Sequence, residues 1–266
     1  MPQPEPTVHE LFDLTGKAVL ITGATGHLGS AMARALAEAG ANVVVSSRSR
    51  QRARDFAATL PRPGGAAHYG VKLDYMDPDS IERGFGDALK VAGRLDVLVN
   101  NGNQPVAADW TTAGAEQLAR QLANGTGFFL LARLMRAHAV QRRAPASIIM
   151  IGSMYGLVGS YPDAYADICN ASPVGYHMLK AGVIQLTRHL AVYWAHDNVR
   201  VNCLSPGPFP GREAPPALPE RLSEKSPMRR MGRARELKGA IVFLASDASS
   251  YMTGQNLIID GGWTAW

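Results

Sequence analysis

Cysteine is scarce in this sequence, with only Cys169 and Cys203 among 266 residues. Two cysteines are too few for the disulfide framework of a small secreted protein, and their spacing matches no metal-binding motif. We therefore expect a reducing, cytoplasmic setting and no metal site.

Long apolar runs and export signals are also missing. The N-terminus, MPQPEPTVHE, lacks the basic segment and following apolar segment of a signal peptide. The longest apolar runs, such as residues 128–132, are far shorter than the ~20 residues that a membrane-spanning helix needs. No run of Lys and Arg alternates with aromatic residues, which argues against binding to nucleic acid. We expect a small-molecule substrate and neither a membrane nor a nucleic-acid partner.

The charge balance is modest and slightly basic. The chain has 27 Lys and Arg against 22 Asp and Glu, a net charge of +5. The plainer interpretation is a solvated basic surface, because net charge affects solubility and association more than it determines the fold. The alternative is attraction to an anionic ligand such as a dinucleotide or an acidic substrate.

Short apolar runs alternate with helical stretches along most of the chain. The strand-like runs are residues 18–22, 42–47, 66–73, 95–99, 147–151, 199–204 and 257–259. This alternation is typical of βαβ units and of a parallel sheet that is buried on both faces. We predict an α/β fold: one doubly wound Rossmann-type domain over residues 12–266, with a mostly parallel seven-stranded sheet covered by helices on both faces. Residues 1–11 are expected to form a flexible tail.

A glycine-rich turn, ITGATGHLG, follows the first strand-like run and opens a helical stretch. Glycines at positions 23, 26 and 29 permit a tight turn and close approach of the backbone to a pyrophosphate at a helix N-terminus. Three glycines alone are weak support, and an ordinary turn between strand and helix is the alternative. The flanking strand and helix favour a dinucleotide site.

Further motifs occur in the order typical of the short-chain dehydrogenase/reductase family, which the chain resembles from residue 12 to residue 263. The matching residues are Thr22 and Gly23 in the turn, Asp74 in KLDYMD, Asn100 and Asn101 in VLVNNGN, Asn124 in LANGTGFFL, Ser153 in IIMIGSMYG, Tyr176 and Lys180 in YHMLK, Pro206 and Gly207, and the closing IIDGG. The segment NASPVGYHMLK is also similar to gluconate-dehydrogenase-like and sugar-acid-associated members.

The resemblance implies hydride transfer between a nicotinamide cofactor and a carbonyl or alcohol group, in a homotetramer. It implies that Ser153 hydrogen-bonds the carbonyl and that Tyr176 is the acid–base group. Lys180 would hold the nicotinamide ribose, and Asn124 would support a water in the proton path. The implied cofactor contacts are Gly23, Thr25, His27, Leu28, Ser47, Arg48, Leu73, Asp74, Asn101, Gly102, Tyr176, Lys180, Pro206, Gly207 and Phe209.

The chain also departs from the family pattern. His27 stands where the ordinary branch places its middle glycine, whereas Gly26 fits the spacing of the larger epimerase-like branch. The sequence NNGN replaces NNAG, which places Asn103 and Gln104 near the expected substrate mouth. Gly211 replaces the threonine that often follows the proline–glycine motif. A redox-neutral epimerase-like enzyme, or a dinucleotide-binding protein of the same fold without catalysis, therefore remains an alternative.

The second strand-like run ends in VVVSSRSR, with no acidic residue to bond an adenosine ribose. Ser47 and Arg48 suit the 2′-phosphate of NADP, because a guanidinium pairs with phosphate through two hydrogen bonds. The alternative is a solvated helix start whose arginines face water: Arg48, Arg50, Arg52 and Arg54. We predict NADP, with NAD possible.

Two tyrosines compete for the role of acid–base group. A free tyrosine has a pKa of about 10, so it needs a nearby positive charge to act near neutral pH. Tyr165 follows Ser153 by 12 residues, the usual family spacing, but its neighbour one turn later is Cys169. Tyr176 follows Ser153 by 23 residues and has Lys180 one helical turn later. We predict Tyr176 as the base and residues 156–172 as an enlarged loop over the substrate.

We expect a polar, anionic substrate such as a sugar acid or keto acid, because the loop 208–233 is rich in basic residues. Its basic residues are Arg212, Arg221, Lys225, Arg229, Arg230 and Arg233. The plainer interpretation is a solvated basic loop. The C-terminal sequence GWTAW supports an oligomer interface, because exposed tryptophans are costly; folding back over the same subunit is the alternative.

Overall fold

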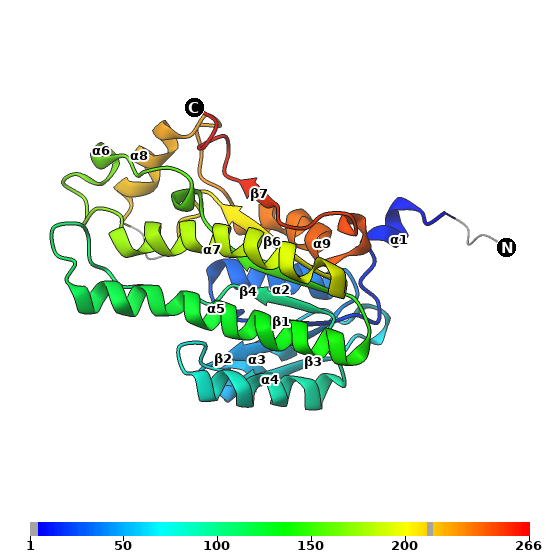
Figure 1. Cartoon of the computed structure of the whole chain (residues 1–266). Coiled ribbons are helices and arrows are strands. Elements are labelled where there is room, and N and C mark those ends of the chain that lie inside the picture. The colour runs from blue at the N-terminus through cyan, green and yellow to red at the C-terminus, as the bar shows by residue number, and fades with distance from the viewer. Residues whose placement is uncertain (1–4, 212–214) are drawn as a thin grey trace.

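The computed structural model describes residues 5–211 and 215–266 (Figure 1). Its seven strands form one sheet in the order β3-β2-β1-β4-β5-β6-β7, and every pairing among them is parallel. The strands are β1 (Ala18–Ile21), β2 (Asn42–Ser47), β3 (His68–Lys72), β4 (Val97–Asn100), β5 (Ala146–Ile151), β6 (Val199–Pro206) and β7 (Asn256–Ile259). The predicted fold class is confirmed, with a sheet that is parallel throughout.

Helices cover both faces of this sheet, as expected. One face packs against α4, α5 and α7, and the other against α2, α3 and α9. The helices are α1 (Val8–Phe12), α2 (His27–Glu38), α3 (Arg50–Ala58), α4 (Pro78–Ala92), α5 (Ala115–Arg142), α6 (Pro162–Tyr165), α7 (Val174–Trp194), α8 (Ala217–Lys225) and α9 (Lys238–Ala245). Figure 1 shows the long α5 and α7 side by side on the near side of the sheet.

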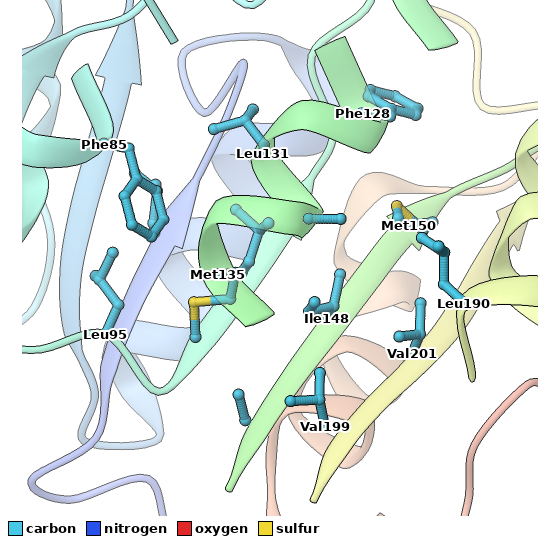
Figure 2. Packing of buried hydrophobic residues seen from close by; sticks show 14 of the residues in the cluster. Phe85, Leu95, Phe128, Leu131, Met135, Ile148, Met150, Leu190, Val199 and Val201 are labelled. Carbon is cyan, nitrogen blue, oxygen red and sulfur yellow. The ribbon is translucent and has the colours of Figure 1, made fainter. Parts of the chain in front are cut away.

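The core explains why the strand sequences are almost uniformly apolar. Successive side chains of a strand point to opposite faces, and here Leu20 enters the core under α4, α5 and α7 while Val19 and Ile21 enter the opposite core. On α5, Phe128, Leu131 and Met135 are three or four residues apart and fully buried against the sheet (Figure 2). Burial of each large side chain contributes about 1.5–3 kcal/mol.

The N-terminal segment is more ordered than the sequence suggested. Residues 8–11 of the expected tail belong to the short helix α1 (Val8–Phe12). Thr7 and Glu10 form a reciprocal capping box at its start, and the Phe12 ring lies 6.2 Å from that of Phe243 in α9. Residues 1–4 lie outside the described residues.

The strand order places a crevice at the carboxyl edge of the sheet. From β1 the chain proceeds through β2 to β3 on one side, and β4 then pairs with the other side of β1. Helices leave β1 and β4 toward opposite faces, and open α/β sheets bind their ligands outside such a reversal. None of the helices in the described ranges is long and apolar enough to cross a membrane.

Candidate active site

A cavity of about 680 Å³ opens at this edge, and it is lined by every residue that was predicted to contact the cofactor. These residues are Gly23, Thr25, His27, Leu28, Ser47, Arg48, Leu73, Asp74, Asn101, Gly102, Tyr176, Lys180, Pro206, Gly207 and Phe209. Ser153 lines the same cavity, whereas Asn124 does not. The fold thus brings together side chains that come from the ends of six strands.

The glycine-rich turn is as tight as the sequence predicted. Gly23 has a φ of +61°, and a Cβ at Gly29 would lie only 2.3 Å from the carbonyl oxygen of Gly23. The Asn101 side chain braces the turn, since its Nδ2 donates to the carbonyl oxygens of Thr22 (2.9 Å) and Gly23 (3.1 Å). The turn leads into the N-terminus of α2, where unpaired backbone N–H groups suit a phosphate.

The arginines after β2 are not equivalent. Arg50 forms an ion pair with Asp87 of α4, with 2.7 Å between Nη2 and Oδ2. Arg48 and Arg52 line the cavity, and neither pairs with an acidic side chain in the described part of the chain. The structure therefore leaves Arg48 available at the position that the NADP prediction requires, next to Ser47.

One cavity residue, Tyr75, was missed by the sequence analysis. Its ring lies against Gly102, and burial raises the pKa of its hydroxyl group. Tyr75 directly follows Asp74, a predicted cofactor contact, and this position in the sequence could have indicated that Tyr75 lines the cavity.

Lys180 lies beside Tyr176, as the spacing predicted. Both residues are on α7, and the Lys180 Nζ atom is 5.5 Å from the centre of the Tyr176 ring. Lys180 is 2% exposed, its Nζ donates to the Ile151 carbonyl oxygen (2.7 Å), and burial lowers its pKa to about 8. Burial raises the pKa of Tyr176, while a hydrogen bond with Ser153 lowers it.

Tyr165 has different surroundings. Its hydroxyl oxygen lies 2.5 Å from that of Tyr155, and the Tyr155 ring stacks on His177 with 4.6 Å between ring centres. His177 in turn hydrogen-bonds Ser172 through Nε2 (3.0 Å). These contacts join the segment 156–172 to the start of α7, and the competing tyrosine is hydrogen-bonded to Tyr155.

Asn124 lies on α5, is fully buried, and hydrogen-bonds a backbone segment that forms part of the cavity wall. Its Oδ1 accepts from the Gln104 backbone N–H (2.8 Å), and its Nδ2 donates to the carbonyl oxygens of Gln104 (3.2 Å) and Gln121 (2.8 Å). The Gln121 side chain likewise accepts from the Val106 N–H (2.9 Å). Two buried side chains of α5 thus hold the segment 104–106 beside the cavity.

Most of the basic residues in the loop 208–233 are already bound within the chain. Lys225 forms an ion pair with Asp163, and its Nζ atom lies 5.2 Å from the centre of the Tyr161 ring. Arg221 donates to the carbonyl oxygens of Asp163 and Ala166. These contacts fasten α8 to α6, which lie together at the upper left of Figure 1.

Two more of these arginines have partners in the same loop region. Arg230 makes two hydrogen bonds to Glu236, at 2.7 and 2.8 Å, and Arg229 donates to the Glu224 carbonyl oxygen. Arg212 lies outside the described residues. The expectation that this loop attracts an anionic substrate therefore loses most of its support.

The C-terminal tryptophans differ from each other. Trp263 is 1% exposed and packs edge-to-face against Tyr155 and Tyr161 of its own chain. Trp266 is 65% exposed. Trp263 therefore folds over its own subunit, and it does not support an oligomer interface.

Known proteins similar to this chain include reductases and sugar-alcohol dehydrogenases. A family model described as enoyl-(acyl carrier protein) reductase matches residues 23–264. An NADP-dependent mannitol dehydrogenase of Hypocrea jecorina is 34% identical, with 99% of each chain covered. A ribulose-forming D-arabinitol 2-dehydrogenase of Candida tropicalis is also 34% identical, over 96% of this chain and 95% of the relative.

Among solved structures, a gluconate 5-dehydrogenase from Burkholderia cenocepacia in complex with NADP and tartrate superposes with a TM-score of 0.86. It is 28% identical, and the match covers 98% of this chain and 100% of that one. The chain belongs to the short-chain dehydrogenase/reductase family. It is accordingly an NAD(P)-dependent oxidoreductase that acts on alcohol or carbonyl groups.

Within this family the chain spans the ordinary length, because its relatives are covered almost from end to end. The glycine spacing that resembles the epimerase-like branch therefore reflects a local difference in the turn, where His27 begins α2. The family assignment predicted from the ordered motifs is confirmed.

Proposed function

We propose that this dehydrogenase interconverts a polyol and a ketose with NADP(H). The observation that carries the proposal is the arrangement of one cavity, with Arg48 and Ser47 at one end and Ser153, Tyr176 and Lys180 at the other. The polyol specificity is supported by the mannitol and arabinitol dehydrogenases among the relatives. Two of the loop cations, Lys225 and Arg230, are paired with acidic side chains, which favours a neutral substrate over a sugar acid.

The residues present fit a dinucleotide. The turn around Gly23 and Gly29 leaves no room for a side chain, so a pyrophosphate can lie against the backbone at the start of α2. Arg48 and Ser47 would hold the 2′-phosphate, with Arg52 adding positive charge. When bound, NADP(H) supplies or accepts the hydride.

The proton is handled by this chain's own side chains. In carbonyl reduction, Tyr176 gives its phenolic proton to the substrate oxygen as the carbonyl carbon gains the hydride. The positive charge of Lys180 stabilises the phenolate that remains. Ser153 would hydrogen-bond the same substrate oxygen and orient it toward Tyr176. In alcohol oxidation Tyr176 removes the proton instead.

We further propose a cytoplasmic homotetramer in which residues 12–266 form one domain. The helices α5 and α7 expose apolar side chains that an interface would cover, including Met178 (50% exposed), Val192 (77%) and Tyr193 (61%) on α7. A mass measured by light scattering at micromolar concentration tests the assembly, and a monomer would contradict it.

The function is tested with NADPH and NADH against a panel of D-fructose, a ketopentose, 5-keto-D-gluconate and an apolar ketone. We expect the highest kcat/KM with NADPH and an uncharged ketose. Highest activity on the keto acid would replace the polyol assignment with a sugar-acid one. Redox-neutral conversion of a sugar, with no change in NADPH absorbance, would contradict the dehydrogenase reaction itself.

A further inference from the structure

Asn103 is a cavity residue to which the proposed reaction assigns no role. It follows β4 and stands where the family motif has glycine, so its side chain is a feature of this sequence. Its backbone is held on both sides: Gly102 N–H donates to the Thr22 hydroxyl oxygen (2.9 Å), and Gln104 N–H donates to Asn124 Oδ1 (2.8 Å). The Asn103 side chain therefore projects from a fixed point on the wall.

The carboxamide of Asn103 has no hydrogen-bond partner within residues 5–211 and 215–266, although its Oδ1 atom is buried. The neighbouring asparagines differ, because Asn101 and Asn124 both bond backbone groups through their side chains. A buried side-chain oxygen without a hydrogen-bond partner is unfavourable and calls for an explanation. Asn103 also lines the cavity, so a bound reactant lies within its reach.

The position in the sheet indicates which part of the reactants lies there. The strand β4 lies between β1, which ends at the glycine-rich turn, and β5, which ends before Ser153. Asn103 is therefore between the expected pyrophosphate site and the proton-transferring groups. Arg48 follows β2, on the far side of β1. Gln104, the next residue in the chain, is an uncharged polar residue of the same wall.

A carboxamide both donates and accepts hydrogen bonds, which complements a hydroxyl group. We propose that Asn103 is a ligand-binding residue whose carboxamide hydrogen-bonds a hydroxyl group of the bound reactants. Two sources offer this chemistry at that position, the nicotinamide-side ribose of the cofactor and a hydroxyl of the polyol or ketose. The second source rests on the proposed function, and the first does not.

The test compares the wild-type enzyme with Asn103→Ala. The matched control is Gln141→Ala, which removes an exposed carboxamide near the end of α5, outside the cavity lining. The dissociation constant of NADPH is measured by fluorescence titration without substrate. The values of kcat and KM are then measured for D-fructose and for 1-deoxy-D-fructose at saturating NADPH, or for another carbonyl compound of the panel if that is what the enzyme reduces.

Loss of one neutral hydrogen bond corresponds to a change of roughly three- to tenfold. If Asn103 binds the ribose, Asn103→Ala raises the NADPH dissociation constant by this factor and leaves the KM for D-fructose unchanged. If it binds the substrate, kcat/KM falls by this factor while NADPH binding is unchanged. A smaller effect on 1-deoxy-D-fructose would then identify the hydroxyl at carbon 1. The control variant should match the wild-type enzyme in both measurements.

Unchanged NADPH binding together with unchanged kcat/KM in Asn103→Ala would overturn the proposal. If Asn103→Ala does not fold, Asn103→Gly restores the family residue and is measured in the same way. Failure of the proposed function looks different: the wild-type enzyme would then reduce no ketose, while NADPH titration would still report on Asn103.

Discussion

The ring of Tyr75 occupies the space that a side chain at Gly102 would need. A Cβ atom at position 102 would lie 2.5 Å from both Cδ1 and Cε1 of Tyr75, closer than any real contact. The glycine of NNGN, where the family often has alanine, is thus matched to an aromatic residue that follows β3. The two positions shape the cavity together although they are distant in sequence.

This match predicts a compensating pair of substitutions. Gly102→Ala should destabilise the protein by about 1–3 kcal/mol, because overpacking forces the ring or the backbone to move. Tyr75→Val alone should leave a gap, and the double variant should be more stable than the sum of the two single effects. Urea unfolding of all four proteins measures the coupling. Additive effects would show that the two residues do not share this space.

The two candidate bases are distinguished by conservative substitution. Tyr176→Phe should lower kcat by about 10² to 10⁴, the usual contribution of a general acid–base group, with NADPH binding retained. Tyr165→Phe removes the hydrogen bond to Tyr155 and should change kcat less than about tenfold. Steady-state kinetics with NADPH titration separates the two. A larger loss in Tyr165→Phe would refute the assignment of Tyr176.

Arg48 should decide between NADPH and NADH. Arg48→Asp removes a charge-assisted pair and adds repulsion, so kcat/KM for NADPH should fall about 10- to 100-fold while that for NADH changes little. Arg50→Ala is the matched control, since Arg50 pairs with Asp87 at the surface and such pairs contribute about 0–1 kcal/mol. Equal losses in both variants would mean that the effect is a general one of surface charge.

Lys180 should make stability depend on pH. Burial lowers its pKa from 10.5 to about 8 in the folded chain. Between these values the unfolded chain binds the extra proton, so this contribution to stability is unfavourable below pH 8 and improves as the pH rises toward 10.5. Lys180→Met lacks this dependence, and it should lose activity.

The check is urea unfolding of the wild type and of Lys180→Met at about pH 7 and about pH 9.5, on either side of the folded-state pKa. The wild type should gain roughly 2 kcal/mol relative to the variant at the higher pH, because pH 9.5 lies about 1.5 units above the folded-state pKa. A difference that stays constant with pH would show that Lys180 titrates as in solvent.

Local patterns were enough to predict the sheet and the residues around the cavity. The apolar runs before Gly23, Asn101 and Ser153 are strands whose carboxyl ends share one edge, and parallel topology alone then brings these residues together. The helical offset between Tyr176 and Lys180 is equally local.

What sequence could not predict depends on contacts between distant segments. The side chain of Asn124 bonds the backbone of Gln104, which no spacing rule reveals. The sequence gives no sign that cations of the loop 208–233 have partners, but Lys225 forms an ion pair with Asp163 on α6. The capped turn at Val8–Phe12 was also missed, although Thr7 and Glu10 have the spacing of a capping box.

The ion pairs of the loop 208–233 affect the rate at which charged reactants bind. Lys225 and Arg230, which are paired with Asp163 and Glu236, contribute little to long-range attraction. Arg48 and Arg52 line the cavity and have no acidic partner within residues 5–211 and 215–266, so they contribute more. Diffusional capture of the dinucleotide should therefore slow as added salt screens these two arginines, while capture of a neutral sugar should proceed at the same rate in dilute and concentrated buffer.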